Sequence, residues 1–285
     1  MANQEHLALL EKEKIWTMWR RNNPQISPDL QEIDLRAKNL EKVNLYGVNL
    51  SKANLEKVNL SRANLEKAEL NQANLNAANL SYANLKQTNL MGANLRKTNL
   101  RQAQLCQANL IGTSLRNSQI QKADFSQAQL NRTNLSEACG EETNFCEANL
   151  SQASLYEAEL QGAYFYRANL SQAQLIQGHL YDSYFVHANL QEIKGDRLDL
   201  RWCNLAQANL QGASLQGANL SYANLSYANL EGVNLEGANL RGANLIGTNL
   251  EQTNLRGVSY QRPFELNKML DIMGKNSSIL IVIDS

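Results

Sequence analysis

An apolar residue recurs every five positions along most of the chain. The series runs from Leu30 to Leu255, and only Gly140 and Gly195 interrupt it. A small residue usually stands two positions before each apolar slot, with an asparagine between them, as in Ala53-Asn54-Leu55. This period matches neither an α-helix, with its period of about 3.6 residues, nor a flat strand, with its period of about 2. The small–polar–large order inside each repeat instead predicts a short strand with both apolar side chains inward, followed by a two-residue turn.

The phenylalanines predict how many repeats close one turn of the coil. Phe125, Phe145, Phe165 and Phe185 recur at every twentieth position. If four repeats make one turn, these rings stack above one another inside the coil, where a large ring packs well against another ring. The expected fold is therefore all-β, a β-helix with four sides, four repeats to the coil and about 11 coils. Gly140 is expected to fill an inward slot of this coil rather than to open a loop.

The repeat A-N-L-x-x over residues 30–260 resembles that of the pentapeptide-repeat family. The segment that precedes it, with Trp16-x-x-Trp19-Arg20, then Asn23-Pro24 and Asp29-Leu30, is similar to the lead-in of many cyanobacterial members. The resemblance implies a right-handed quadrilateral β-helix. It implies little about activity, because function depends on sites that differ among proteins of one fold.

The two ends of the coil need protection, since a solenoid exposes unpaired backbone groups there. We expect residues 1–29 to form an N-terminal lead-in with a helix over 4–21, residues 30–260 the coil, and residues 261–285 a C-terminal helix and tail. Leu266, Met269, Leu270 and Met273 have the spacing of an amphipathic helix. Capping is the expected role of both ends. A homodimer through one cap remains open beside a monomer.

Two windows depart from the repeat. Residues 191–199, around Gly195, lack the A-N-L pattern and are predicted to loop out, and loops on rigid scaffolds often carry function. Cys139-Gly140-Glu141-Glu142 is a milder irregularity. Cys139 and Cys146 flank this second window and are the candidate redox pair, whereas Cys203 is expected to point inward.

Aromatic residues gather close to the first window. Five of the ten tyrosines lie between positions 156 and 184, and exposed tyrosines on a rigid surface are typical of interface hot spots. Covering backbone is the other role that such tyrosines can have. The candidate partner-binding residues are Tyr156, Tyr164, Tyr166, Tyr181, Tyr184, His187, Lys194, Arg197 and Trp202.

Charge narrows the classes of function. The chain carries 27 Lys and Arg against 27 Asp and Glu, but residues 36–132 hold 14 basic and 5 acidic side chains, and residues 133–200 hold 3 basic and 10 acidic. The sequence favours a non-enzymatic scaffold that binds an unidentified protein. Two alternatives are a DNA mimic that protects a topoisomerase, which needs continuous negative potential, and nucleic-acid binding through the basic half.

The motifs of other function classes do not occur in the sequence. We see no catalytic spacing of histidines, no phosphate-binding loop and no metal motif, so we expect neither enzymatic activity nor a cofactor, a metal or a small-molecule substrate. There is no signal-peptide pattern, and the apolar runs are too short to span a membrane. A cytoplasmic location without membrane contact is the expectation.

Overall fold

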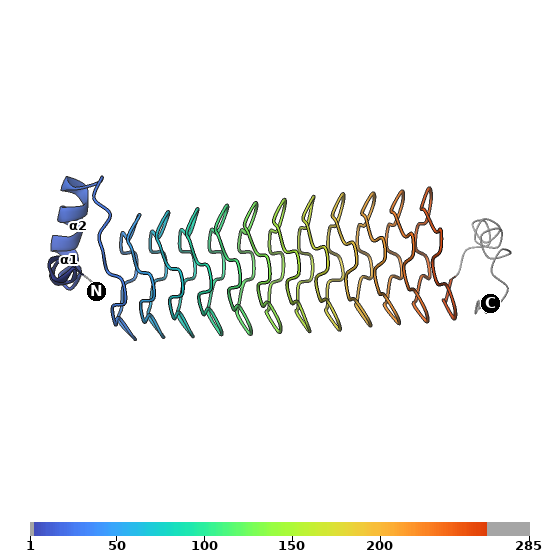
Figure 1. Cartoon of the computed structure of the whole chain (residues 1–285), viewed down its shortest axis with the longest axis horizontal. Helices are drawn as coiled ribbons and strands as arrows, with labels where there is room; N and C mark the ends of the chain where they lie inside the picture. The colour runs from blue at the N-terminus through green and yellow to red at the C-terminus, as the bar shows by residue number, and fades with distance from the viewer. Residues whose placement is uncertain (1–2, 261–285) are drawn as a thin grey trace. The chain divides into compact units, whose positions relative to one another are not determined.

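The structure is a computed structural model that describes residues 3–260 (Figure 1). The chain divides into two compact units, Met1–Cys139 and Gly140–Ser285, which we call unit 1 and unit 2. Both units carry the five-residue repeat. The helix and tail predicted for residues 261–285 lie outside the described residues.

Each repeat consists of one extended residue and one tight turn. In the repeat that follows Leu55, the amide of Val58 donates to the carbonyl of Leu55 at 3.1 Å, and Lys57 at the third position of the turn has a φ of 57°. A positive φ at the third position alone defines a type II turn. This position usually calls for glycine, but lysine, glutamine, arginine and tyrosine also occupy it along the described chain. The extended residues form isolated parallel bridges rather than longer strands.

Bridges join residues 20 positions apart, so four repeats close one turn of the coil in each unit. In unit 1 they run from Asp29↔Asn49 to Gln119↔Cys139, and in unit 2 from Asn144↔Tyr164 to Asn239↔Ser259. The amide of Leu55 donates to the carbonyl of Asn74 at 2.7 Å, and the amide of Asn74 donates back to Ala53 at 2.9 Å. The coil of four repeats predicted from the phenylalanine spacing is confirmed within both units.

We name the four sides of the coil after the residues at their bridge slots, and each corner after the two sides that it joins. In unit 2, side A holds Asn144, Tyr164, Tyr184 and Asn204; side B holds Asn149, Asn169 and Asn189; side C holds Ser154, Gln174 and Lys194; side D holds Glu159, His179 and Asp199. Unit 1 is named with the same period. The chain passes the sides in the order A, B, C, D, so A lies opposite C and B lies opposite D.

The inward slots make the core. Leucine fills most of the large slots and alanine most of the small ones, and nearly all of these side chains are fully buried. In unit 2 the rings of Phe145 and Phe165 stack at 5.0 Å, and those of Phe165 and Phe185 at 4.6 Å. The predicted phenylalanine stack is thus present in unit 2. Hydroxyl groups in small slots are satisfied between coils, as where Thr88 Oγ1 donates to the carbonyl of Leu65 at 2.9 Å.

Asparagines in the outward slots link the coils through their side chains. Asn59 Nδ2 donates to Asn39 Oδ1 at 2.8 Å, and Asn79 Nδ2 donates to Asn59 Oδ1 at 3.2 Å. Asn59 Oδ1 also accepts from the backbone amide of Ser61, so one amide group both caps its own turn and joins the next coil. This double role explains why asparagine recurs at the slot.

The N-terminal lead-in forms two helices, α1 (Gln4–Leu10) and α2 (Glu13–Asn22), instead of the single helix expected over residues 4–21. The helix breaks at Lys12, which has a φ of −116° and a ψ of 87°, outside the helical region. The side chain of Asn3 caps α1 by accepting from the amides of Glu5 and His6. The break gives α2 its own direction toward the first coil of unit 1 (Figure 1).

Helix α2 holds the first coil through two polar side chains. Trp16 is buried, and its Nε1 donates to the carbonyl of Asn44 at 2.8 Å. Arg20 Nη1 donates to the carbonyl of Ile26 at 2.7 Å, and Nη2 donates to that of Tyr46 at 2.5 Å. Burial lowers the pKa of Arg20. These bonds satisfy carbonyl groups of the first coil, which has no preceding coil to receive them from.

Residues 191–199 do not loop out, contrary to the expectation from their sequence. Lys194 forms parallel bridges with Gln174 and Ser214, and the amide of Gly195 donates to the carbonyl of Ser214 at 2.7 Å. Gly195 faces inward, where an added Cβ would lie 2.9 Å from Leu215 Cδ2 and 3.1 Å from Leu198 Cδ2. These two leucines fill the volume that a leucine at position 195 would occupy, so the coil continues without a large residue there.

Candidate partner-binding face

Side A of unit 2 exposes a pair of stacked tyrosines. Tyr164 and Tyr184 occupy outward slots in consecutive coils, with ring centroids 5.2 Å apart and planes inclined by 6°. They are 42% and 47% exposed, whereas Phe165 and Phe185 beside them in the chain are buried. Alternation along each short strand therefore places one ring outside and the next one inside.

The corner between sides D and A carries three more rings. Trp202 and Tyr222 stack at 4.2 Å with planes inclined by 7°. Tyr181 lies under the guanidinium of Arg201 at 5.6 Å, and Arg201 is paired with Asp199 at 2.7 Å. Trp202 and Tyr222 occupy equivalent turn positions in consecutive coils, and both have positive φ.

Glycine lets these rings lie flat on the neighbouring turn. A Cβ added to Gly242 would meet Tyr222 Cδ1 at 2.6 Å, and one added to Gly247 would meet Tyr227 Cδ1 at 2.5 Å. Both glycines have positive φ, so glycine here serves the turn and the ring together.

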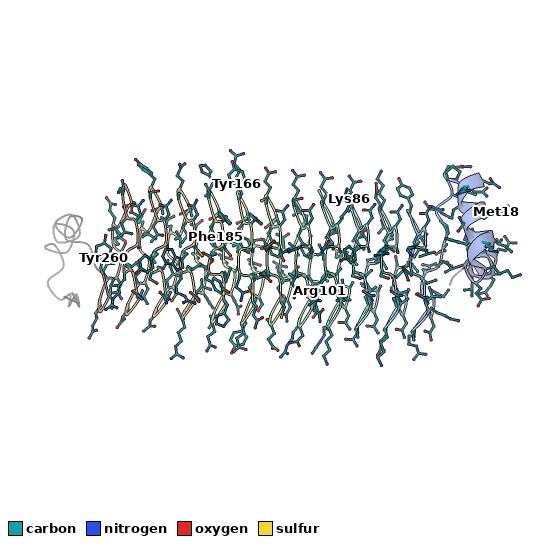
Figure 2. The ribbon with its side chains drawn as sticks, turned by 180° about the vertical axis from the view of Figure 1, so that it is seen from behind. Met18, Lys86, Arg101, Tyr166, Phe185 and Tyr260 are labelled. Carbon is teal, nitrogen blue, oxygen red and sulfur yellow. The ribbon has the colours of Figure 1, made fainter. Side chains whose placement is uncertain are left out.

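The corner between sides A and B continues the aromatic surface. Tyr166 and His187 meet edge to face at 6.0 Å, and the guanidinium of Arg167 lies 5.2 Å from the Tyr166 ring. Figure 2 shows Tyr166 at the surface and Phe185 inside the coil. Tyr227, on the same corner, is 65% exposed.

Side A and its two corners form one surface, which we call the aromatic face. It consists of Tyr164, Tyr166, Tyr181, Tyr184, His187, Trp202, Tyr222 and Tyr227. Six of these were candidates from the sequence. The structure brings them together because their positions differ by about one coil, and it adds Tyr222 and Tyr227, which sequence reasoning missed. The spacing of one full coil from Trp202 to Tyr222 is the signal that could have found them.

The other three sequence candidates lie elsewhere in unit 2. Lys194 is on side C, opposite the aromatic face. Tyr156 and Arg197 are on the corner between sides C and D, where the Tyr156 hydroxyl donates to Glu157 at 2.7 Å. Neighbours in sequence therefore point to different sides of the coil.

The aromatic face offers binding rather than covalent chemistry. Cys203 lies behind it, almost fully buried, and its Sγ donates to the carbonyl of Leu180 at 2.9 Å. Burial raises the pKa of this thiol far above its ordinary range, so it stays protonated and unreactive at neutral pH. Within residues 3–260, no group of three or more His, Cys, Asp and Glu side chains could hold a metal ion. Neither described helix is long and apolar enough to cross a membrane.

Comparison with known proteins identifies the repeat. The family model for pentapeptide repeats matches residues 29–62, 59–96, 98–136, 141–172, 163–194, 199–237 and 234–259. A search of curated proteins finds no match.

Several solved structures are similar to this chain. One is HetL, a pentapeptide repeat protein involved in heterocyst differentiation regulation in the cyanobacterium Nostoc sp. strain PCC 7120, which is 28% identical over 85% of this chain and 94% of its own, with a TM-score of 0.38. Another is Rfr23 from the cyanobacterium Cyanothece 51142, which is 31% identical over 48% of this chain and 86% of its own, with a TM-score of 0.17. QnrB1, a plasmid-mediated fluoroquinolone resistance protein, is 14% identical over 88% of this chain and 98% of its own, with a TM-score of 0.32.

Proposed function

The chain belongs to the pentapeptide-repeat family, whose right-handed quadrilateral β-helix is a rigid scaffold, and we propose that it works as a non-enzymatic protein-interaction scaffold. The proposed binding surface is the aromatic face of unit 2. The proposed partner is a cytoplasmic protein that covers this face with apolar and hydrogen-bonding groups.

The observation that carries the proposal is the exposure of stacked aromatic rings on a rigid backbone. Tyr184, Trp202 and Tyr227 are 47%, 58% and 65% exposed. Tyrosine and tryptophan are enriched at interface hot spots because each buries a large apolar area and keeps a polar group for hydrogen bonding. Stacking between coils already restricts these side chains, so a partner loses little conformational entropy in ordering them.

Charge makes DNA mimicry the weaker candidate. A DNA mimic needs a continuous negative surface. Side D of unit 1 with its two corners carries six basic side chains and one acidic one between residues 56 and 116. Binding of nucleic acid through the aromatic face is also disfavoured, because exposed acidic side chains such as Asp182 border it.

We also infer that the repeat winds about 11 coils and that α1 and α2 cap its N-terminal end. The bonds from Trp16 and Arg20 to carbonyls of the first coil support the capping role. A covered edge would keep the first coil from pairing with another chain.

The test compares Tyr164→Asn/Tyr184→Asn with the wild type. Asparagine is the usual residue of both slots, so this variant keeps the fold and removes only the rings. We expect a partner captured from extracts of the source cells, once purified, to bind this variant at least ~10-fold more weakly, as for loss of a hot spot. Circular dichroism establishes that the variant is folded.

Tyr156→Asn is the matched control. Tyr156 is an exposed tyrosine outside the aromatic face, and Asn76 stands at the corresponding place of the coil in unit 1. This control should bind like the wild type. Equal binding by all three proteins, or equal loss in both variants, would refute the aromatic face as the working surface.

A further inference from the structure

The basic side chains of unit 1 gather on one side of its coil. Between residues 56 and 116, side D and its two corners carry six basic residues and only one acidic residue, Glu56. The six are Lys57, Arg62, Arg96, Lys97, Arg101 and Arg116. The opposite side B and its corners are nearly balanced from residue 46 to 112, with Lys52, Lys67 and Lys86 against Glu66 and Glu69. Figure 2 shows Lys86 and Arg101 at different edges of unit 1.

Three of these cations are available to a ligand. Arg96, Lys97 and Arg101 are exposed, and none of them forms an ion pair with another described residue. Arg101 Nε donates only to Gln121 Oε1, at 3.1 Å. Arg116, by contrast, is paired with Glu137 at 2.6 Å. We call the set Arg96, Lys97 and Arg101 the basic patch.

In unit 2 the same side of the coil has the opposite charge. From residue 141 to 202, side D and its two corners carry seven acidic and two basic side chains. The exposed acidic ones are Glu141, Glu142, Glu157, Glu159 and Asp182, which we call the acidic patch. Both basic residues, Arg197 and Arg201, stand near its C-terminal end, and Arg201 is already paired with Asp199. The bias is local, because side B of unit 2 with its corners holds only Glu147, Glu192 and Arg167 from residue 146 to 207.

We propose that the basic patch of one copy binds the acidic patch of a second copy of this chain. Each copy presents both charges, and they stand on rigid coils with the same spacing between rungs, so rows of opposite charge can meet in register. A second copy also explains the balance of 27 basic and 27 acidic residues, since a chain without net charge has no long-range attraction for a nucleic acid. Exposed ion pairs are individually weak, so the association is modest and salt-sensitive.

This inference is independent of the proposed function. The charged patches centre on side D, whereas the aromatic face centres on side A, and the two surfaces share only the corner that joins those sides. Loss of self-association therefore leaves Tyr164 and Tyr184 in place, and loss of partner binding through these tyrosines leaves the charges in place.

The first measurement is the molar mass of the full chain by sedimentation equilibrium at about 50 mM and about 500 mM salt. We expect a mass above that of the monomer that rises with protein concentration at low salt, and a monomer at high salt. A closed pair stops at twice the monomer mass, while an open chain of copies grows further; both support the proposal. A monomer at all concentrations and at low salt overturns it.

Charge reversals then locate the contact. Arg96→Glu/Lys97→Glu/Arg101→Glu makes the basic patch acidic, and Glu141→Lys/Glu157→Lys/Asp182→Lys makes the acidic patch basic. Each new residue matches one of the same charge at the corresponding position of another coil, such as Glu56, Glu41 or Lys57, so both variants should fold. We expect each to be monomeric alone, with a dissociation constant raised on the order of 10-fold or more.

Mixing the two variants is the decisive arm. An equimolar mixture places acidic patches opposite basic ones again and should restore a heterocomplex. The matched control Lys52→Glu/Lys67→Glu/Lys86→Glu changes the net charge equally on the opposite side and should associate like the wild type. Failure of the mixture to associate, or equal loss in the control, overturns the proposal. Retardation of a DNA or RNA duplex by a monomeric wild type would assign the basic patch to nucleic acid instead.

Discussion

Two neighbouring sides of unit 2 share one backbone and differ in what they expose. On side B, Asn169 and Asn189 form rungs of an amide ladder, and on side A, Tyr164 and Tyr184 fill the corresponding slots. Both pairs form the same parallel bridge. The backbone ladder therefore does not need asparagine, and the outward slots are free to carry function while the inward slots hold the fold.

Removing an inward ring should break both sides together and have the largest effect. Phe165 is fully buried between Phe145 and Phe185, so Phe165→Ala leaves a cavity and should lower the free energy of unfolding by about 3–5 kcal/mol. Urea denaturation measures the change. Phe165→Leu, which places the usual residue in the slot, should lose much less; equal stability of the alanine variant and the wild type would contradict the stacked core.

Filling Gly195 should destabilise the coil by a smaller amount. Leucine here overlaps the volume that Leu198 and Leu215 occupy, and overpacking costs about 1–3 kcal/mol. Thermal unfolding of Gly195→Leu tests this expectation. Gly195→Ala is the control and should cost less, because the closest atoms are ends of flexible leucine side chains. A leucine tolerated without loss would indicate a loop.

Exchanging the outward residues sharpens the comparison directly. Asn169 accepts from the amide of Ser171 at 3.1 Å and from Asn189 at 3.1 Å, so Asn169→Ala should cost about 1 kcal/mol of unfolding free energy. Tyr184→Asn should be close to neutral, because it trades a ring stack for the amide ladder. Urea midpoints of the two variants decide the matter, and a larger loss for Tyr184→Asn would show that the rings stabilise the coil.

A carboxylate in the outward slot gives the smallest effect. Asp34 accepts hydrogen bonds from the guanidinium and the amide of Arg36, which lower its pKa to about 2. Because this pKa lies below the ordinary value of about 4, the stabilising contribution of the pair is present above about pH 4 and is lost as the pH falls toward 2. Both groups are exposed, so the change in stability is small.

Carbon-detected NMR titration measures the Asp34 carboxyl directly. Arg36→Gln should return its pKa toward about 4. A wild-type value already near that figure would contradict the pairing. Arg201 and Asp199 form the same arrangement in unit 2, which allows the comparison to be repeated there.

The sequence was enough to predict the coil, because the five-residue period and the wider spacing of the phenylalanine rings are satisfied by one backbone path. It was misleading at Gly195, since the missing side chain suggested a loop although neighbouring leucines fill the space. The break at Lys12 also escaped prediction, because it depends on where Trp16 and Arg20 meet the first coil.

The candidate site was predictable in part. Tyr164 and Tyr184 follow from the outward slot and the period of one coil. Lys194 and Arg197 were grouped with them because they are near in sequence, but each repeat of this coil turns the chain by one whole side. Distance in the chain is therefore a poor guide to a shared surface here, and position within the coil is a good one.

The uniform spacing of the bridges also bears on how the chain folds. Every bridge in either unit joins residues only 20 positions apart, so no contact of this β structure waits for distant parts of the chain to meet. Folding rates fall as contacts become less local, and repeat arrays can nucleate at any repeat and propagate through neighbours. Each unit should therefore fold from many starting points, more like a helical array than like an ordinary β-sandwich.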